Sequence, residues 1–289
     1  MRIVIAFMWL LHWLPLPLLG RFGEAVGSLL FMLLKSRRHI ALTNLRLCMP
    51  ELSEAERVAL ARRHFQAYSR SVWERAILWW APESRLRRLI KVEPAMPMHE
   101  FESGPVIVLC PHFVCLDVAG AACAMAATMS SMYVAQSNKA FDDVLRRGRE
   151  RFRPVRIFSR QEGIKPILRA LRERMPYFML PDMDFGDKDA PFVPFFGVPA
   201  ATLTATARIA ASTGAKVIPV VATYLPNYQG WQVKFYPAWD DYPGDDMIEA
   251  TRRMNAFIEE RVREAPAEYF WTHKRFKTRP AGEPSPYAK

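Results

Sequence analysis

The sequence predicts an α/β protein whose largely parallel, twisted sheet is flanked by helices and preceded by an N-terminal helical membrane anchor. From residue 104 onward, short β-branched and apolar runs alternate with helical patterns, an order typical of a parallel sheet covered on both faces. The 289 residues are 51% apolar, enough to bury one large core. Most of the first 34 residues are apolar, which indicates a separate membrane-binding segment.

The N-terminal segment has the composition of a membrane anchor. Residues 3–20 approach the length of roughly 20 residues that crosses a bilayer, although one histidine and two prolines weaken a straight span. A second apolar stretch covers 22–34, and the basic cluster at 35–39 is placed to meet anionic headgroups. Two buried helices of a soluble core are the alternative, but Trp9 and Trp13 favour a membrane interface. No small-residue cleavage site follows, so we expect a retained anchor.

The next part of the chain is predicted to be helical and basic. Ser53-Glu54-Ala55-Glu56 is a capping box, so a helix should begin near Ser53 and extend to about Trp80. Residues 91–104 contain two prolines and a glycine and indicate a linker. The expected division of the chain is an anchor at 1–34, a basic helical region with linker at 35–103, and an α/β core with a basic C-terminal segment at 104–289.

The predicted core alternates strands and helices. Strands are expected at Val106–Cys110, Ser131–Ala135, Val155–Phe158, Tyr177–Leu180, Val217–Tyr224 and Gln232–Tyr236. Helices are expected at Leu116–Met129, Phe141–Arg151, Ile164–Arg174, Leu203–Ser212 and Met247–Arg263, and a loop at 181–203. Ligands of such sheets bind beyond the carboxyl ends of the strands, so polar residues at those ends are candidates for a site.

His112 lies in the first of these strand-to-helix turns, and Asp117 lies in the first turn of the following helix. A carboxylate at this place can accept the imidazole Nδ1–H and leave Nε2 free to take a proton. The alternative is that Asp117 only complements the helix dipole. A second alternative is that Cys115 acts as a thiol nucleophile. Such a cysteine is more commonly a small residue that packs in the core.

Further polar groups follow other strands. Arg160 follows the strand that ends at Phe158, and Asp182 and Asp184 follow the strand that ends at Leu180. Pro219 interrupts the backbone donors of its strand and predicts an edge position. The two aspartates also suggest a rival class, the metal-dependent Asp-x-Asp glycosyltransferases, because carboxylate oxygens suit Mn²⁺ or Mg²⁺.

The charge balance indicates anionic partners. The net charge is +11 and the isoelectric point about 9.7, which suits anionic lipid, an acidic protein or nucleic acid. We expect no nucleic-acid partner, because no zinc-finger spacing or nucleic-acid module accompanies the charge. The four cysteines have no paired spacing and suggest reduced thiols in the cytosol.

Taken together, these residues resemble a known family. His112-x₄-Asp117 matches the His-x₄-Asp/Glu signature of glycerolipid-type acyltransferases, and the ordered set of motifs is similar to the bacterial lipid A late acyltransferases (the lauroyl/myristoyl transferases). The motifs are Asn44-Leu-Arg-Leu-Cys-Met-Pro-Glu-Leu-Ser53, Pro181-Asp-Met-Asp184, Phe192-Val-Pro-Phe-Phe-Gly197, Ala201-Thr-Leu-Thr-Ala-Thr206 and Trp271-Thr-His-Lys-Arg-Phe-Lys-Thr-Arg-Pro280. Position 183 is Met where the family more usually has Gln, which puts a polar role there in doubt.

The resemblance implies an enzyme that moves a fatty acyl chain from an acyl carrier protein thioester to a hydroxyl of a lipid A precursor. It implies catalysis at the cytoplasmic face of the inner membrane, with anionic lipids nearby and with neither a metal nor another cofactor. His112 would be the general base and Asp117 would orient its ring. Another glycolipid or an aminolipid as acceptor stays open.

The remaining matches imply substrate contacts. Arg160 would bind phosphate or donor, and Asp182 and Asp184 would hold the acceptor or brace the loop around His112. Arg208 is not one of these matches; it lies on the predicted helix after the 181–203 loop and is expected to face the same cleft. Lys277 belongs to a basic C-terminal cluster that would either contact a glycolipid phosphate or form a solvated tail, together with Lys274, Arg275 and Arg279.

Overall fold

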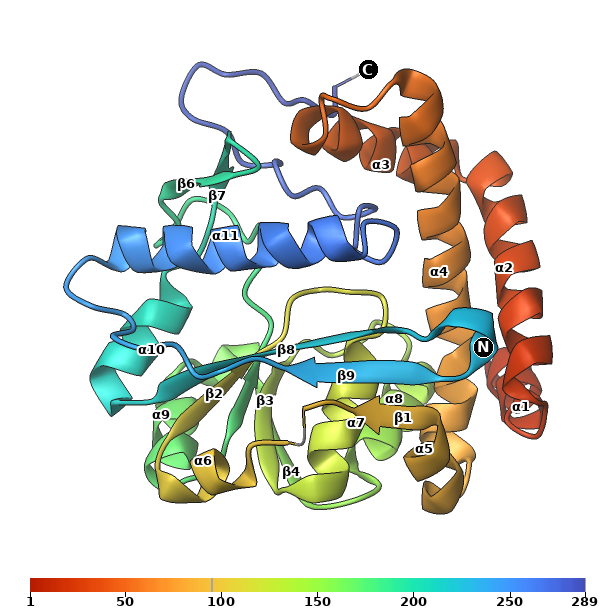
Figure 1. Ribbon diagram of the computed structural model, residues 1–289, viewed down its shortest axis with the longest axis horizontal. Coiled ribbons are helices and arrows are strands. Elements are labelled where there is room, and N and C mark those ends of the chain that lie inside the picture. Colours follow the sequence, from red (N-terminus) through yellow and green to blue (C-terminus); the bar gives the residue numbers. More distant parts are fainter. Residues whose placement is uncertain (95, 289) are drawn as a thin grey trace.

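A mixed, mostly parallel sheet lies at the centre of the protein, with helices on both faces (Figure 1). The structure is a computed structural model and describes residues 1–94 and 96–288. Its first half contains α1 Arg2–Leu11, α2 Leu16–Leu33, α3 Lys35–Cys48, α4 Glu54–Trp80, α5 Glu83–Leu89, β1 Ile90–Val92, α6 Met98–Ser103, β2 Val106–Leu109, α7 Leu116–Ala126, β3 Met129–Tyr133 and α8 Lys139–Glu150.

The second half completes the sheet and its covering helices. It contains β4 Val155–Ser159, the short 3₁₀ helix η1 Arg160–Glu162, α9 Lys165–Arg172, β5 Tyr177–Met179, β6 Phe192–Phe195, β7 Val198–Ala201, α10 Ala205–Thr213, β8 Lys216–Tyr224, η2 Pro226–Tyr228, β9 Trp231–Phe235 and α11 Met247–Glu264. Among the described residues, the central sheet has seven strands in the order β1-β9-β8-β2-β5-β3-β4. Only the β8–β9 pair in this sheet is antiparallel, so the predicted fold class is confirmed.

Strand β2 divides the core in two because its side chains alternate between the faces of the sheet. Val106 and Val108 pack into one apolar cluster with α7, the C-terminal half of α4 and residues of α1 and α2. Ile107 and Leu109 pack into the other cluster, with α3, α9 and α11. The N-terminal residues 1–34 therefore share a core with the rest of the chain; the predicted division of the chain into three parts stays a prediction.

Helix α4 begins as the sequence predicts. Ser53 Oγ accepts the N–H of Glu56, and a Glu56 carboxylate oxygen accepts the N–H of Ser53 at 2.7 Å. This reciprocal pair satisfies two backbone donors that have no partner inside the helix. The helix then runs to Trp80, the predicted end.

Three predictions about local structure are wrong. The expected linker 91–104 contains α6 and most of β1, and the expected loop 181–203 contains the β6–β7 hairpin, whose register pairs Phe192 with Ala201. Pro219 does not mark an edge strand, because β8 lies between β9 and β2. The pairing of β8 with β9 ends at Val220, and Pro219 lies one residue beyond it. The missing N–H of Pro219 therefore removes at most one backbone hydrogen bond, at the end of this pairing.

Candidate active site

His112 is held at the carboxyl end of β2 by a carboxylate from the neighbouring strand. Strands β2 and β5 pair in parallel, so the residues that follow them meet at one edge of the sheet. The Nδ1 of His112 lies 2.6 Å from Oδ1 of Asp182, and the backbone N–H of His112 donates to the same carboxylate at 3.0 and 3.1 Å. An ionised Asp182 accepts from Nδ1–H, which leaves Nε2 as the ring's proton acceptor.

The segment that follows α11 (residues 265–288, the C-terminal segment) holds the His112 turn (residues 111–115) in place from the other side. The N–H of Phe270 donates to the carbonyl of His112 at 3.0 Å, and the N–H of Val114 donates to the carbonyl of Glu268 at 2.8 Å. The Phe270 ring stacks against the imidazole, with 6.5 Å between centroids. The imidazole is 15% exposed, so it is positioned but remains accessible.

The environment of His112 favours an ionised Asp182. Burial by itself raises the pKa of the Asp182 carboxyl, but the charge of His112 and its hydrogen bonds outweigh that and bring the pKa below the usual range. Nearby, burial and the neighbouring His112 lower the pKa of His273 to about 4. His273 is therefore neutral at pH 7, and its Nε2 accepts the N–H of Asp184.

Asp117 does not contact His112 as the sequence predicted. Its carboxylate accepts from Arg75 Nε at 2.6 Å and from Arg149 at 2.8 Å. The reason is that the first turn of α7 faces α4 and α8, and these helices carry the two arginines. Burial raises the pKa of the Asp117 carboxyl, but the charges of Arg149 and Arg75 outweigh it and hold the pKa far below the usual range. Asp182 takes the predicted place of Asp117 beside the imidazole.

A largely apolar cavity is lined in part by the Asp117–Arg149 pair. Both residues line it, and so do Leu116 and Leu180, the neighbours in sequence of the His112 turn and of Asp182. Its walls come from α4, α7, α8, β3, β4 and β5, and the further lining residues include Trp79, Gly120, Met132, Tyr133, Ile157 and Phe178. The lining is mostly apolar and includes the charged Asp117 and Arg149, a composition suited to a hydrocarbon chain next to a polar group.

The other predicted site residues lie apart from the imidazole. Arg160 is exposed and its guanidinium lies over the Phe185 ring at 5.0 Å. Arg208 is 61% exposed and pairs with Asp189 at 3.4 Å. Lys277 is exposed. Among the described residues, no hydrogen bond or ion pair connects these three cations to His112, and their substrate contacts stay predictions.

Asp184 braces the C-terminal segment. Its carboxylate accepts the N–H and the hydroxyl of Thr278, each at 2.7 Å, and the N–H of Gly186 at 3.0 Å. In the same segment Arg275 is buried and donates to the carbonyl of Ala201 and to Thr202 Oγ1. The idea that the basic C-terminal cluster is a solvated tail is therefore wrong for Arg275, which is part of the core.

Cys115 is not placed as a nucleophile. Its thiol is buried, with Sγ 3.9 Å from a carboxylate oxygen of Glu268. Burial and the nearby Glu268 raise the pKa of the thiol well above its ordinary value, so it is a thiol and not a thiolate at neutral pH.

Sequence reasoning missed Arg75, Arg149 and Glu268. One signal was available for the arginines: an aspartate predicted at the start of a buried helix needs a cationic partner, and the predicted helix 141–151 is rich in arginine. No local signal pointed to Glu268, whose contacts to the His112 turn depend on the path of the C-terminal segment.

The comparison with known proteins defines the class. The family model described as bacterial lipid A biosynthesis acyltransferase matches residues 1–278. The chain belongs to this family and is an acyltransferase. The glycosyltransferase alternative is thereby overturned. The two aspartates on which it rested form hydrogen bonds instead, Asp182 with His112 and Asp184 with Thr278.

Three Escherichia coli K12 proteins illustrate the relationship. The lipid A biosynthesis palmitoleoyltransferase is 32% identical over 286 residues, which are 98% of this chain and 92% of that protein. The lauroyltransferase is 31% identical over 98% of this chain and 93% of its own. The myristoyltransferase is 33% identical over 94% and 84%. These similar proteins carry names with three different acyl groups, so the family alone does not define which chain is transferred.

Proposed function

We propose that the protein transfers a fatty acyl chain from an acyl carrier protein thioester to a hydroxyl of a lipid A precursor, at the cytoplasmic face of the inner membrane. Family membership supports the reaction class and the acceptor. The observation that carries the mechanism is the 2.6 Å contact between His112 Nδ1 and Asp182 at the carboxyl ends of the neighbouring strands β2 and β5.

His112 is the general base in this mechanism. Its Nε2 takes the proton of the acceptor hydroxyl while the oxygen attacks the thioester carbonyl, and the C–S bond then breaks to release the carrier's thiolate, which receives the proton. The thioester is already activated, so no covalent enzyme intermediate is needed. Asp182 orients the ring and stabilises the imidazolium without accepting its proton.

Asp117 serves the donor side of the reaction. It holds Arg149 at the cavity, where a fixed cation stabilises negative charge that develops at the carbonyl oxygen. The cavity beyond it accepts the acyl chain. The surplus of basic residues suits an acidic carrier protein and the phosphates of the acceptor.

A transfer assay tests the proposal. Membranes with the protein are given a radiolabelled lipid A precursor and a panel of acyl carrier protein thioesters, with EDTA present. His112→Ala should lower the rate by roughly 10²–10⁴-fold, the usual contribution of a general base. His99→Ala is the matched control, since His99 is exposed on α6. Full activity of His112→Ala would contradict the mechanism, and a requirement for added Mn²⁺ would contradict a metal-free reaction.

A further inference from the structure

Helices α1 and α2 present an apolar surface to solvent. Their exposed large side chains are Ile3, Val4, Phe7, Trp9, Leu10, Trp13, Leu18, Leu29, Met32 and Leu33. Helix α2 is also long enough to cross a membrane, since its 18 residues at about 1.5 Å each give about 27 Å. The question is whether α2 crosses the bilayer or lies in it.

The inner face of α2 is joined to α4 by backbone contact. The two helices lie side by side (Figure 1). A Cβ added at Gly23 would come within 2.7 Å of the Arg70 Cα, and one added at Gly27 would come within 2.5 Å of the Phe65 carbonyl oxygen. Such close approach leaves no room for lipid between the helices, and it makes α2 a fixed part of the folded domain.

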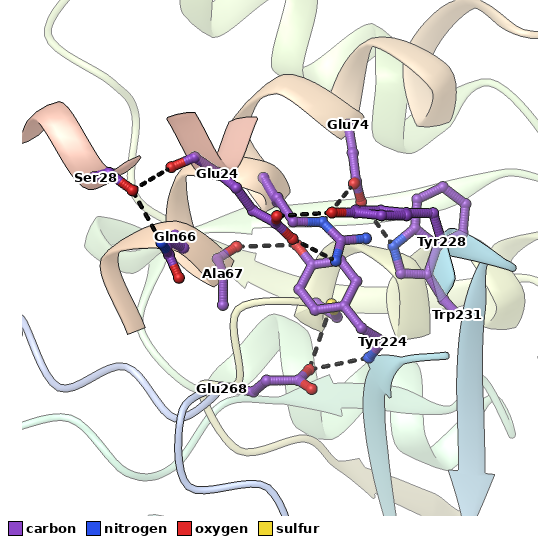
Figure 2. A network of polar contacts seen from close by, with 11 residues as sticks. Glu24, Ser28, Gln66, Ala67, Glu74, Tyr224, Tyr228, Trp231 and Glu268 are labelled. Carbon is purple, nitrogen blue, oxygen red and sulfur yellow. Dashed lines mark hydrogen bonds and ion pairs between the residues drawn. The ribbon is translucent and has the colours of Figure 1, made fainter. Parts of the chain in front are cut away.

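Polar contacts also join α2 to the residues that it packs against. Figure 2 shows Glu24 of α2 beside the Tyr228 hydroxyl, which donates to it at 2.7 Å, and Ser28 bonded to Gln66 of α4 at 2.9 Å. Arg70, whose side chain is 8% exposed, lies 3.4 Å from Glu24 and 2.9 Å from Glu74. Separating α2 from α4 would leave this buried charge without one of its partners.

The same network reaches the His112 turn. The Arg70 guanidinium lies 3.8 Å from the Tyr224 ring centroid, and the Tyr224 N–H donates to the Glu268 carboxylate at 3.0 Å. The Glu268 carbonyl in turn accepts the Val114 N–H. The position of α2 is therefore linked to the position of the imidazole through a continuous set of contacts.

A crossing α2 would carry charges into the bilayer. Arg21 lies on its exposed face, and Arg62 of α4 lies beside its other end, 5.8 Å from the Phe31 ring centroid. Arg63 is exposed next to Arg62. An arginine costs ~2.5 kcal/mol or more at the centre of a membrane helix and less near its ends. A crossing α2 that brings α4 along would add Arg21, Arg62 and Arg63 to the membrane, so it is disfavoured.

We infer that α1 and α2 bind one leaflet of an anionic membrane as an in-plane platform and that neither helix crosses it. The exposed apolar side chains enter the leaflet, Trp9 and Trp13 occupy the interface, and Arg2, Arg21 and Lys35 meet anionic headgroups. This inference rests on the membrane association in the proposed function and specifies its geometry. It predicts that both ends of α2 stay on the cytoplasmic side.

Topology labelling tests the inference on the full chain expressed in a Gram-negative host. Trp13→Cys and Lys35→Cys place single accessible thiols at the two ends of α2, and the wild type, whose cysteines are buried, gives the background. A membrane-impermeant maleimide should label neither variant in intact spheroplasts, should label Lys35→Cys in inverted vesicles, and should label both in detergent. Labelling of either position in intact spheroplasts would overturn the inference.

Vesicle binding provides a second measurement that does not depend on acyl transfer. Leu10→Gln should weaken co-sedimentation with phosphatidylglycerol/phosphatidylethanolamine vesicles by about tenfold. Ile248→Gln on α11 is the matched control, since Ile248 is 54% exposed and Leu10 is 59% exposed. Equal effects of the two variants would contradict the platform, and a protein that binds vesicles but transfers no acyl chain would contradict the proposed function alone.

Discussion

Asp182 and Asp117, two aspartates with little exposed surface, have different partners. Asp182 faces a single imidazole that can gain or lose a proton, whereas Asp117 lies between two guanidinium groups that stay charged. Both carboxyls have lowered pKa values, although burial acts against ionisation in each. In the proposed mechanism the first arrangement prepares a base for proton transfer, and the second holds a permanent positive charge beside an apolar cavity.

The comparison teaches that spacing along the chain does not define a catalytic pair. His112 and Asp117 are close in sequence, yet α7 turns the carboxylate toward α4 and α8. Asp182 is 70 residues away in sequence and reaches the imidazole because β2 and β5 are neighbours in the sheet. Strand order therefore decides which carboxylate orients the base.

The largest effect on stability is expected at Asp117. Asp117→Asn removes the carboxylate that pairs with both Arg75 and Arg149 and leaves the half-buried Arg75 without this charged partner, which should cost about 3 kcal/mol in the free energy of unfolding. The estimate is at the low end of the range for buried pairs because Arg149 remains 36% exposed. Denaturant unfolding measures the loss. Asp189→Asn, which affects an exposed pair with Arg208, should change the free energy of unfolding by less than about 1 kcal/mol.

The cavity that Asp117 and Gly120 line should select the chain length. A Cβ at Gly120 would meet no atom within 4 Å, so Gly120→Met fills empty space in the cavity. We expect transfer from long-chain donors to fall by about tenfold or more relative to short-chain donors, because methylene groups are excluded. Competition between two acyl carrier protein thioesters measures the ratio. An unchanged ratio would place the acyl chain elsewhere.

Glu268 provides a third carboxyl for the comparison. Its carboxylate contacts the Tyr224 N–H and the Cys115 thiol, and within the described part of the chain it forms no ion pair. Burial raises its pKa to about 7, above the ordinary glutamate value of 4.5 that applies in the unfolded chain. The folded state then holds a proton that the unfolded state has lost, so this group makes stability fall as the pH rises from about 4.5 to 7. Glu268→Gln should flatten that part of the stability profile, measured by thermal unfolding. A wild-type slope in the variant would show that another group is responsible.

Much of the fold follows from local patterns, whereas the site depends on tertiary contacts. The capping box at Ser53 and the apolar run from Val106 predicted α4 and β2 because these signals are local. The β6–β7 hairpin was missed because its strands are short and contain prolines. His112 was predicted as part of the site from its position after a strand, but its partner depends on strand order and the C-terminal segment depends on long-range packing.

A double-mutant cycle tests the central claim that Asp182 orients His112. The rate of acyl transfer is measured for Asp182→Asn, His112→Ala and the variant with both changes, with thermal unfolding as the check on folding. Asp182→Asn alone should lower the rate by roughly 10²-fold or more, within the range of general base catalysis. In the His112→Ala background, the same change should cost little more, because the base that it orients is gone. If Asp182→Asn keeps the wild-type rate, or lowers the rate equally in both backgrounds, Asp182 does not act through His112.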